Sequence, residues 1–201
     1  MIRILLADDQ ALVRGALAAL LSLEPDIEVV AEVGRGDEVL AAAVAAAVDV
    51  CLLDVEMPGA DGIAAAAELR RSAPGIRSII VTTFGRPGYV RRALEAGAGG
   101  FVVKDTPASE LAEAVRRVHA GERVVDPALA TESLLDGANP LTDREADVLR
   151  ASVDGATVAR VAVAVHLSAG TVRNYASTAI AKTGAGTRVE AARIARDRGW
   201  L

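Results

Sequence analysis

Short apolar runs alternate with stretches of helical periodicity along residues 1–125. The runs that predict β-strands are Ile2–Ala7, Ile27–Glu32, Val50–Asp54, Arg77–Thr82 and Gly100–Val103. The stretches that predict helices are Ala11–Leu23, Glu38–Ala47, Ile63–Ser72, Tyr89–Ala96 and Ser109–Ala120. Five strands, each followed by a helix, predict an α/β fold with a doubly wound five-stranded parallel sheet. Such a sheet places its functional residues at the carboxyl ends of its strands.

The pattern changes after Gly121, a residue type that commonly ends helices. Residues 127–140 mix Pro, Ala, Ser, Gly and Asn with only weak helical periodicity. Beyond this stretch no strand pattern returns, and helices are expected over Asp143–Val153, Val158–Val165, Ala169–Thr183 and Arg188–Arg198. We therefore predict an α/β domain over residues 1–121, a linker over 122–139 and a four-helix all-α domain over 140–201.

The two parts of the chain differ in charge, although the whole carries a formal net charge of −5. Residues 139–201 contain nine Lys/Arg against six Asp/Glu, whereas residues 1–138 contain 13 against 21. Any contact with nucleic acid is therefore expected from the second domain.

The sequence also indicates where the protein works. The single cysteine, Cys51, cannot form an internal disulfide. Acidic Asp8 and Asp9 follow the first apolar run at once, which is unlike a signal peptide. No apolar run reaches the roughly 18 residues that a membrane span needs. We expect a cytoplasmic protein without direct membrane contact.

Three acidic residues stand at strand ends. Asp8 and Asp9 follow the first strand and Asp54 ends the third. Each alone could be a helix N-cap. Together, at strand ends that converge on one edge of a parallel sheet, they would repel one another unless a cation bound there. Hard oxygen ligands favour Mg²⁺, which keeps several waters.

Thr82 ends the fourth strand and Lys104 follows the fifth, so a hydroxyl and an ammonium point to the same edge. A carboxylate nucleophile, a metal ion, a hydroxyl donor and a lysine are the groups that phosphoryl transfer requires, because its catalysis is positioning and charge neutralisation. The combination therefore predicts a phosphoryl-accepting site.

At these positions the chain resembles the receiver domains of two-component response regulators, which have a flavodoxin-like fold. The resemblance rests on Asp8-Asp9, the run Asp54-Val55-Glu56-Met57-Pro58-Gly59-Ala60-Asp61-Gly62, Thr82 and Lys104-Asp105, and it covers roughly residues 1–120.

The resemblance implies a role for each residue of the site. Asp54 would be the phosphoacceptor. Asp9, Asp54 and the main-chain carbonyl of Glu56 would ligate Mg²⁺, with Asp8 helping through water.

By the same resemblance, Lys104 would bind one phosphoryl oxygen and Thr82 another. Phe101 occupies the family's aromatic switch position and would turn inward as Thr82 moves; it could equally be a core side chain.

The predicted all-α domain contains a helix-turn-helix pattern, Val158–Val165, a turn, and Ala169–Thr183. Thr142 and Glu145 have the spacing of a capping box, and Ser168 precedes the second helix as an N-cap. Amphipathic helix pairs are common, so this pattern alone does not establish DNA binding.

The all-α domain resembles the LuxR-type domain of the NarL/FixJ subfamily, through Leu141-Thr142-Asp143-Arg144-Glu145, Thr171-Val172-Arg173-Asn174 and Lys182-Thr183-Gly184. It implies that Arg173, Asn174 and Ser177 face DNA bases and that Thr171 and Lys182 contact phosphates. The sequence departs from the usual pattern at Arg160-Val161-Ala162, at Thr183 and at Ser177, where many relatives have Lys. These departures affect the target sequence and affinity more than the fold.

Two further segments, Thr83-Phe84-Gly85-Arg86-Pro87-Gly88-Tyr89 and Arg198-Gly199-Trp200-Leu201, are similar to those of regulators that control fatty-acid desaturase genes under a membrane thermosensor kinase.

The family implies that a sensor histidine kinase phosphorylates Asp54, and that the phosphorylated chain forms a homodimer, through its first and fifth helices, that binds promoter DNA. It would not be an enzyme, apart from slow self-dephosphorylation. Two alternatives are a DNA-binding regulator independent of phosphorylation and a Mg²⁺-dependent phosphatase acting through an aspartyl phosphate. The phosphatase would need an Asp where this chain has Glu56.

Overall fold

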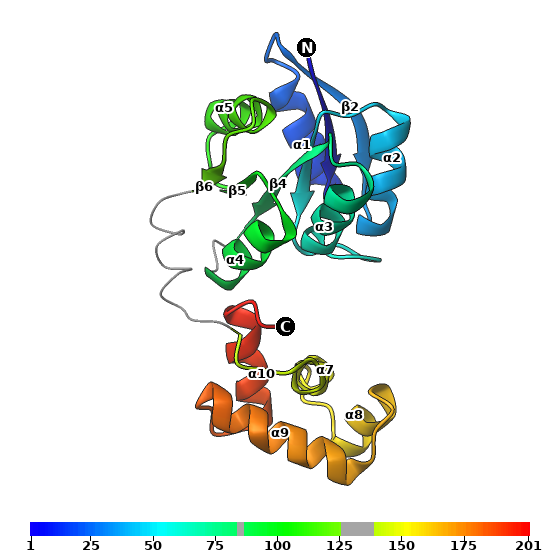
Figure 1. The fold of residues 1–201 in the computed structure, drawn as a ribbon, viewed down its shortest axis with the longest axis vertical. Helices are drawn as coiled ribbons and strands as arrows, with labels where there is room; N and C mark the ends of the chain where they lie inside the picture. Colours follow the sequence, from blue (N-terminus) through cyan, green and yellow to red (C-terminus); the bar gives the residue numbers. More distant parts are fainter. Residues whose placement is uncertain (84–86, 126–138) are drawn as a thin grey trace. The chain divides into compact units, whose positions relative to one another are not determined.

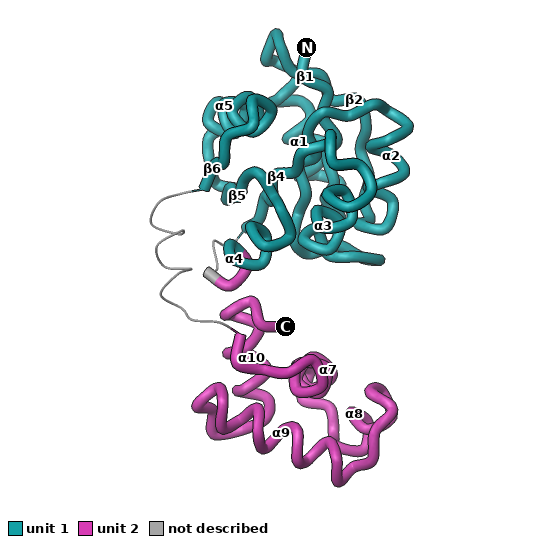
Figure 2. The backbone as a smooth tube through the Cα atoms, in the orientation of Figure 1, with its two compact units in different colours: residues 1–85, 90–131 teal, residues 86–89, 132–201 magenta. Residues whose placement is uncertain are grey.

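The computed structural model describes residues 1–83, 87–125 and 139–201. The chain forms two compact units (Figure 2), one of Met1–Gly85 and Val90–Thr131 and the other of Arg86–Tyr89 and Glu132–Leu201. Residues 126–138 of the expected linker, and 84–86 of the loop noted above, lie outside the described residues.

The first unit is built on a parallel sheet with the strand order β2-β1-β3-β4-β5-β6 (Figure 1). The strands are β1 Ile2–Ala7, β2 Ile27–Val33, β3 Val50–Asp54, β4 Arg77–Thr82, β5 Gly100–Val103 and β6 Val124–Val125. The five predicted strands are confirmed. The sixth, which pairs with β5 and falls in the segment expected as linker, is not predicted because two residues show no periodicity.

The strand order places the functional edge of the sheet. It reverses between β1 and β3, which pair with each other from Ile4↔Val50 to Ala7↔Leu53. In doubly wound sheets the crevice outside the carboxyl ends of such a strand pair is where ligands bind. Asp8, Asp9 and Asp54 all follow or end these two strands.

Helices lie on both sides of this sheet (Figure 1). They are α1 Ala11–Leu21, the 3₁₀ turn η1 Gly36–Glu38, α2 Val39–Ala45, α3 Gly62–Ser72, α4 Pro87–Ala96 and α5 Ala108–His119. All five predicted helices are present with small shifts at their ends. The second is shorter because its first turn is 3₁₀ and because Ala47, with φ of 47°, leaves the helical conformation.

The sheet has an apolar core on each face because strand side chains alternate. On one face, side chains of α1 and α5 pack against the sheet, with a cluster that includes Leu21, Leu111, Val115, Ile4, Leu6, Val50, Leu52, Ile79 and Val81. Alternation places Leu5, Cys51, Leu53 and Ile80, all fully buried, on the other face, where α2 and α3 contact the strands. Burial raises the pKa of the free Cys51 thiol to about 12, which keeps it unreactive.

The second unit is all-helical, with α7 Asp143–Arg150, α8 Val158–Ala164, α9 Ala169–Thr183 and α10 Arg188–Asp197. Each begins at a hydroxyl N-cap, Thr142, Thr157, Ser168 and Thr187 respectively, that accepts a hydrogen bond from a backbone N–H three residues on. The predicted capping box at Thr142 and Glu145 is confirmed.

Helix α9 is the centre of this unit, since it contacts α7, α8 and α10. Its buried side chains join two apolar clusters: Ala179 lies with Leu149 and Trp200, and Val172 and Ala176 lie with Val148 and Val161. Most of these side chains are small, which lets the helices approach closely. No helix in the described parts of the chain is long and apolar enough to cross a membrane.

Candidate functional site

The predicted acidic cluster forms at the carboxyl ends of β1 and β3. Asp8, Asp9 and Asp54 each offer a carboxylate oxygen, and these atoms lie within 4.8 Å of one another. Asp8 and Asp54 are buried, at 3% and 6% exposed, whereas Asp9 is exposed. The site is thus a half-enclosed group of hard oxygen donors that remains open to water on the side of Asp9.

Lys104 lies in the same cluster. Its Nζ is 2.6 Å from Asp8 Oδ2 and 3.1 Å from Asp54 Oδ1. The other oxygen of Asp8, Oδ1, accepts a hydrogen bond from the backbone N–H of Gln10 at 2.9 Å. Asp8 is therefore held at both oxygens. Three ionised carboxylates and one ammonium leave a formal charge of −2 at the site, which a divalent cation would neutralise.

The buried charges shift one another's titration. Burial raises the pKa of Asp54; Lys104 opposes this shift and the Asp8 carboxylate adds to it, and the net pKa lies above its ordinary value. Burial alone would lower the pKa of Lys104, but hydrogen bonds and charges from Asp8 and Asp54 outweigh it and raise the pKa. Lys104 is therefore a permanent cation beside a carboxylate that is costly to keep ionised.

The remaining residues of the predicted site lie on or directly after β3, β4 and β5. Thr82 ends β4 and is buried, and the backbone N–H of Lys104 donates to its carbonyl oxygen at 2.7 Å. Phe101 lies on β5, pairs with Ile80 and is 2% exposed, so its ring is already buried. Glu56 follows β3 in the loop and is exposed.

Asp61, in the loop after Asp54, makes two contacts, of which the sequence indicates only one. Asp61 is the N-cap of α3, where its Oδ1 accepts from the N–H of Ala64 at 2.6 Å. Its Oδ2 is 3.1 Å from Arg92 Nη2, so Asp61 also connects the loop after Asp54 to α4. An acidic residue before a helical stretch signals the cap, but nothing in the sequence identifies the partner on α4.

The backbone at Gly62 lies so close to the carbonyl oxygen of Asp54 that no side chain fits there. A Cβ at Gly62 would lie 1.9 Å from the carbonyl oxygen of Asp54, although the residue is helical and its φ is not among the positive ones. The backbone around Asp54 and the start of α3 are therefore fixed against each other.

We expect Gly62→Ala to destabilise the protein by roughly 2–4 kcal/mol, because neither backbone segment can move without disturbing the sheet. Gly15→Ala is the matched control. Nothing lies within 4 Å of a Cβ there, so in the interior of α1 the same change should stabilise by about 0.5–1 kcal/mol. Urea unfolding of both variants measures the two effects; equal effects would contradict the close-approach argument.

The second candidate site is the exposed face of α9. Arg173, Asn174 and Ser177 are all exposed, and so is Thr178, which the sequence analysis did not include. The Thr178 hydroxyl donates to the carbonyl oxygen of Asn174 at 3.1 Å. At the start of the helix, the Thr171 hydroxyl is 2.8 Å from Ser168 Oγ. These side chains form one polar surface on a helix that follows a turn.

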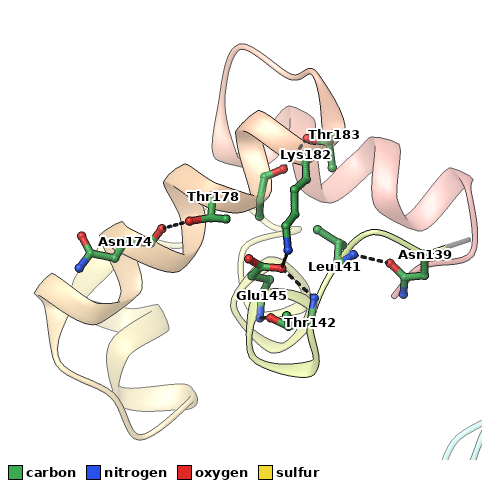
Figure 3. A network of polar contacts seen from close by, with 9 residues as sticks. Asn139, Leu141, Thr142, Glu145, Asn174, Thr178, Lys182 and Thr183 are labelled. Carbon is green, nitrogen blue, oxygen red and sulfur yellow. Dashed lines mark hydrogen bonds and ion pairs between the residues drawn. The ribbon is translucent and has the colours of Figure 1, made fainter.

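Lys182 is located differently. Its Nζ is 2.7 Å from Oε2 of Glu145, which is buried on α7 (Figure 3). The LuxR-type resemblance implies that Lys182 contacts DNA phosphate, whereas in the structure Lys182 has a partner within the domain.

Comparison with known proteins identifies the class to which these sites belong. Residues 4–116 match the response regulator receiver domain family, and residues 139–195 match the family of bacterial regulatory proteins of the luxR type. These two matches define a response regulator that carries a DNA-binding domain, and the chain belongs to this family of transcription regulators.

The curated relatives are of the same kind and the same length. The chain is 44% identical to the transcriptional regulatory protein DesR of Bacillus subtilis and 43% identical to the uncharacterized transcriptional regulatory protein YvfU of the same species, in each case over 100% of both chains. Among solved structures, it is similar to the response regulator ChrA of a heme-sensing two-component system, with 31% identity and a TM-score of 0.59 over 100% of this chain and 98% of that one.

Proposed function

We propose that Asp54 is the phosphoacceptor through which a sensor histidine kinase controls this regulator's binding to promoter DNA. The observation that carries the proposal is the convergence of Asp8, Asp9 and Asp54 within 4.8 Å, together with a lysine that contacts two of them. The raised pKa of Asp54 agrees with this role, since perturbed titration is common at functional sites.

The donor set fits Mg²⁺, because it consists of carboxylate oxygens beside an opening to water. Asp9, Asp54 and the main-chain carbonyl of Glu56 would hold the ion. Asp8, whose two oxygens already have partners, would act through water. When bound, Mg²⁺ supplies charge that offsets the carboxylates and the phosphoryl oxygens.

In the proposed reaction an Asp54 carboxylate oxygen attacks the phosphorus of the kinase's phosphohistidine. The P–N bond breaks as the new P–O bond forms, and the histidine ring leaves with the electron pair. Lys104, already 3.1 Å from Asp54 Oδ1, binds one phosphoryl oxygen, and the Thr82 hydroxyl donates to another. Slow attack by water on the aspartyl phosphate would return the chain to its resting state.

Phosphorylation would shift a two-state surface of the receiver. Thr82 would move toward the phosphoryl group and the Phe101 ring would occupy the space behind it. To change a mostly inactive population into a mostly active one, the phosphoryl group must favour the active state by about 5 kcal/mol. The resulting homodimer would form through α1 and α5. On α1, Leu12 is 87% exposed and Leu20 is 45% exposed, and burial of such side chains would favour dimerisation.

In the dimer, the two α9 helices would enter the major groove at adjacent half-sites. Arg173, Asn174 and Ser177 would read base edges and Thr171 would contact a phosphate. Residues 1–121 would form the receiver domain, 122–139 the linker and 140–201 the DNA-binding domain. A regulator that binds promoter DNA in a bacterium would work in the cytoplasm, without direct membrane contact.

Acetyl phosphate with Mg²⁺ tests the proposal. The DNA is a set of genomic fragments selected by binding to the phosphorylated protein. In a gel shift, we expect the treated protein to bind these fragments at least 10-fold more tightly than the untreated protein does, because dimerisation brings two DNA-binding domains onto one site. Equal affinity in both states would favour the regulator that is independent of phosphorylation. Repeated turnover of a generic phosphomonoester would favour the phosphatase.

A further inference from the structure

We propose that Lys182 does not contact DNA but positions the recognition helix: its ammonium binds the buried Glu145 carboxylate and fixes the C-terminal part of α9 against α7. The inference rests on the proposed use of α9 for DNA binding and replaces the phosphate contact that the sequence resemblance implies for Lys182.

The pair joins two helices that are far apart in sequence. Lys182 Nζ is 2.7 Å from Glu145 Oε2 across 37 residues, and the Glu145 side chain is 5% exposed while that of Lys182 is 31% exposed. Figure 3 shows the Lys182 side chain extending from α9 to the start of α7. A buried carboxylate that lost this ammonium would remain as an uncompensated charge, which is strongly destabilising.

Glu145 itself is fixed to the N-terminus of α7. Its Oε2 also accepts from the backbone N–H of Thr142 at 2.7 Å, and its own N–H donates to Thr142 Oγ1, which completes the capping box. Burial alone would raise the pKa of Glu145, but the hydrogen bonds from Lys182 and Thr142 outweigh it and lower the pKa. The ammonium of Lys182 therefore attaches to a rigid point of α7 rather than to a mobile surface side chain.

The position of Lys182 along α9 separates it from the residues proposed to read bases. Around the helix, at 100° per residue, it lies about 180° from Arg173 but about 20° from Thr171, so the separation is along the helix axis. Lys182 is in the last turn of α9, whereas recognition helices contact bases mainly through their N-terminal residues.

The choice of cation along the chain agrees with this assignment. The sequence contains 20 arginines and only two lysines, Lys104 and Lys182. Each lysine contacts a buried carboxylate, Lys104 at Asp8 and Asp54 and Lys182 at Glu145.

The salt dependence of DNA binding separates the two roles of Lys182. The plot of log K against log salt concentration has a negative slope, and loss of one phosphate contact reduces the magnitude of this slope by about 0.9. We expect Lys182→Met to leave this slope unchanged for the full chain on a duplex of random sequence, and to lower the melting temperature by roughly 5–10 °C. A reduction of about 0.9 in the magnitude of the slope would overturn the proposal.

A double-mutant cycle with Glu145→Gln tests the pair itself, because it compares the melting temperature of the double variant with those of the two single variants. The double variant Glu145→Gln/Lys182→Met has no unpaired buried charge. Its melting temperature should therefore be higher than the sum of the two single-variant decreases predicts. Additive melting temperatures would overturn the proposal. Arg150→Met is the matched control: it removes an exposed pair of similar length, Arg150 Nη1 to Asp147 at 2.8 Å on α7, and should change neither readout measurably.

The two lysines also give a chemical readout. In wild-type protein, an amine-acetylating reagent should modify Lys182 slowly, and Glu145→Gln should accelerate this reaction at least several-fold, with Lys104 in the same digest as an internal reference. An unchanged rate would contradict the pair. If the wild-type chain binds no DNA while the cycle still shows coupling, the proposed function fails and the positioning of α9 stands.

Discussion

Asp54→Asn is expected to abolish labelling of the protein by acetyl phosphate in the presence of Mg²⁺. The amide has no anionic oxygen to attack phosphorus, and the other two carboxylates of the cluster are not substitutes. Asp8 is held at both oxygens by Gln10 and Lys104, and Asp9 lies at the exposed side of the site. Mass spectrometry of the intact protein measures the loss. Labelling at the wild-type level would contradict the assignment of Asp54.

Glu56→Gln is the matched control for this experiment. It removes a carboxylate two residues from Asp54, but only the main-chain carbonyl of Glu56 is proposed to ligate Mg²⁺. Labelling should therefore persist in this variant. If it were lost to the same extent as in Asp54→Asn, the main-chain assignment of the third ligand would be wrong.

Asp54→Asn should also stabilise the metal-free protein. Because the pKa of Asp54 is raised in the folded state, its ionisation opposes folding. This unfavourable contribution is absent below the unfolded pKa, grows as the pH rises from the unfolded to the folded pKa, and is fully present above the folded pKa. Removal of the Asp54 charge should raise the free energy of unfolding by roughly 0.5–2 kcal/mol at pH 7 in EDTA. Functional residues are often kept although they destabilise the fold. The gain should vanish at acidic pH, and Mg²⁺ should stabilise the wild type more than the variant.

The sequence predicts the fold well where polar residues interrupt apolar runs. The bounds of β1, β3, β4 and β5 agree with the prediction because each of these strands contains an apolar run of at least three residues with a polar residue or a turn beside it. The acidic cluster could be predicted for a related reason, since a parallel sheet brings its strand ends together whatever the details of packing. β6 could not be predicted, because two valines carry no periodic signal.

Contacts between distant helices could not be predicted in the same way. The capping box of Thr142 and Glu145 follows from spacing within one helix, but the partner that Glu145 takes on α9 depends on how α7 and α9 pack. The same holds for Asp61, whose capping role is local and whose pair with Arg92 is not. A motif match transfers the residue type but not its partner, so the LuxR-type resemblance does not reveal the contact of Lys182 with Glu145.

Arg173→Ala is expected to weaken binding to selected genomic fragments by about 10- to 100-fold, the equivalent of roughly 1.4–2.8 kcal/mol, because an arginine that reads a base edge makes a bidentate contact. Arg173 is exposed near the start of α9 and adjoins Asn174 on the same surface. Affinity for random-sequence duplex should fall much less, since that binding depends on phosphates. Arg193→Ala removes the same charge from an exposed position on α10 and should weaken both kinds of binding slightly and equally. The ratio of the two affinities is therefore the decisive quantity: it should collapse in Arg173→Ala and stay constant in Arg193→Ala. A constant ratio in both variants would mean that Arg173 acts on the DNA backbone and that sequence is read elsewhere on the domain.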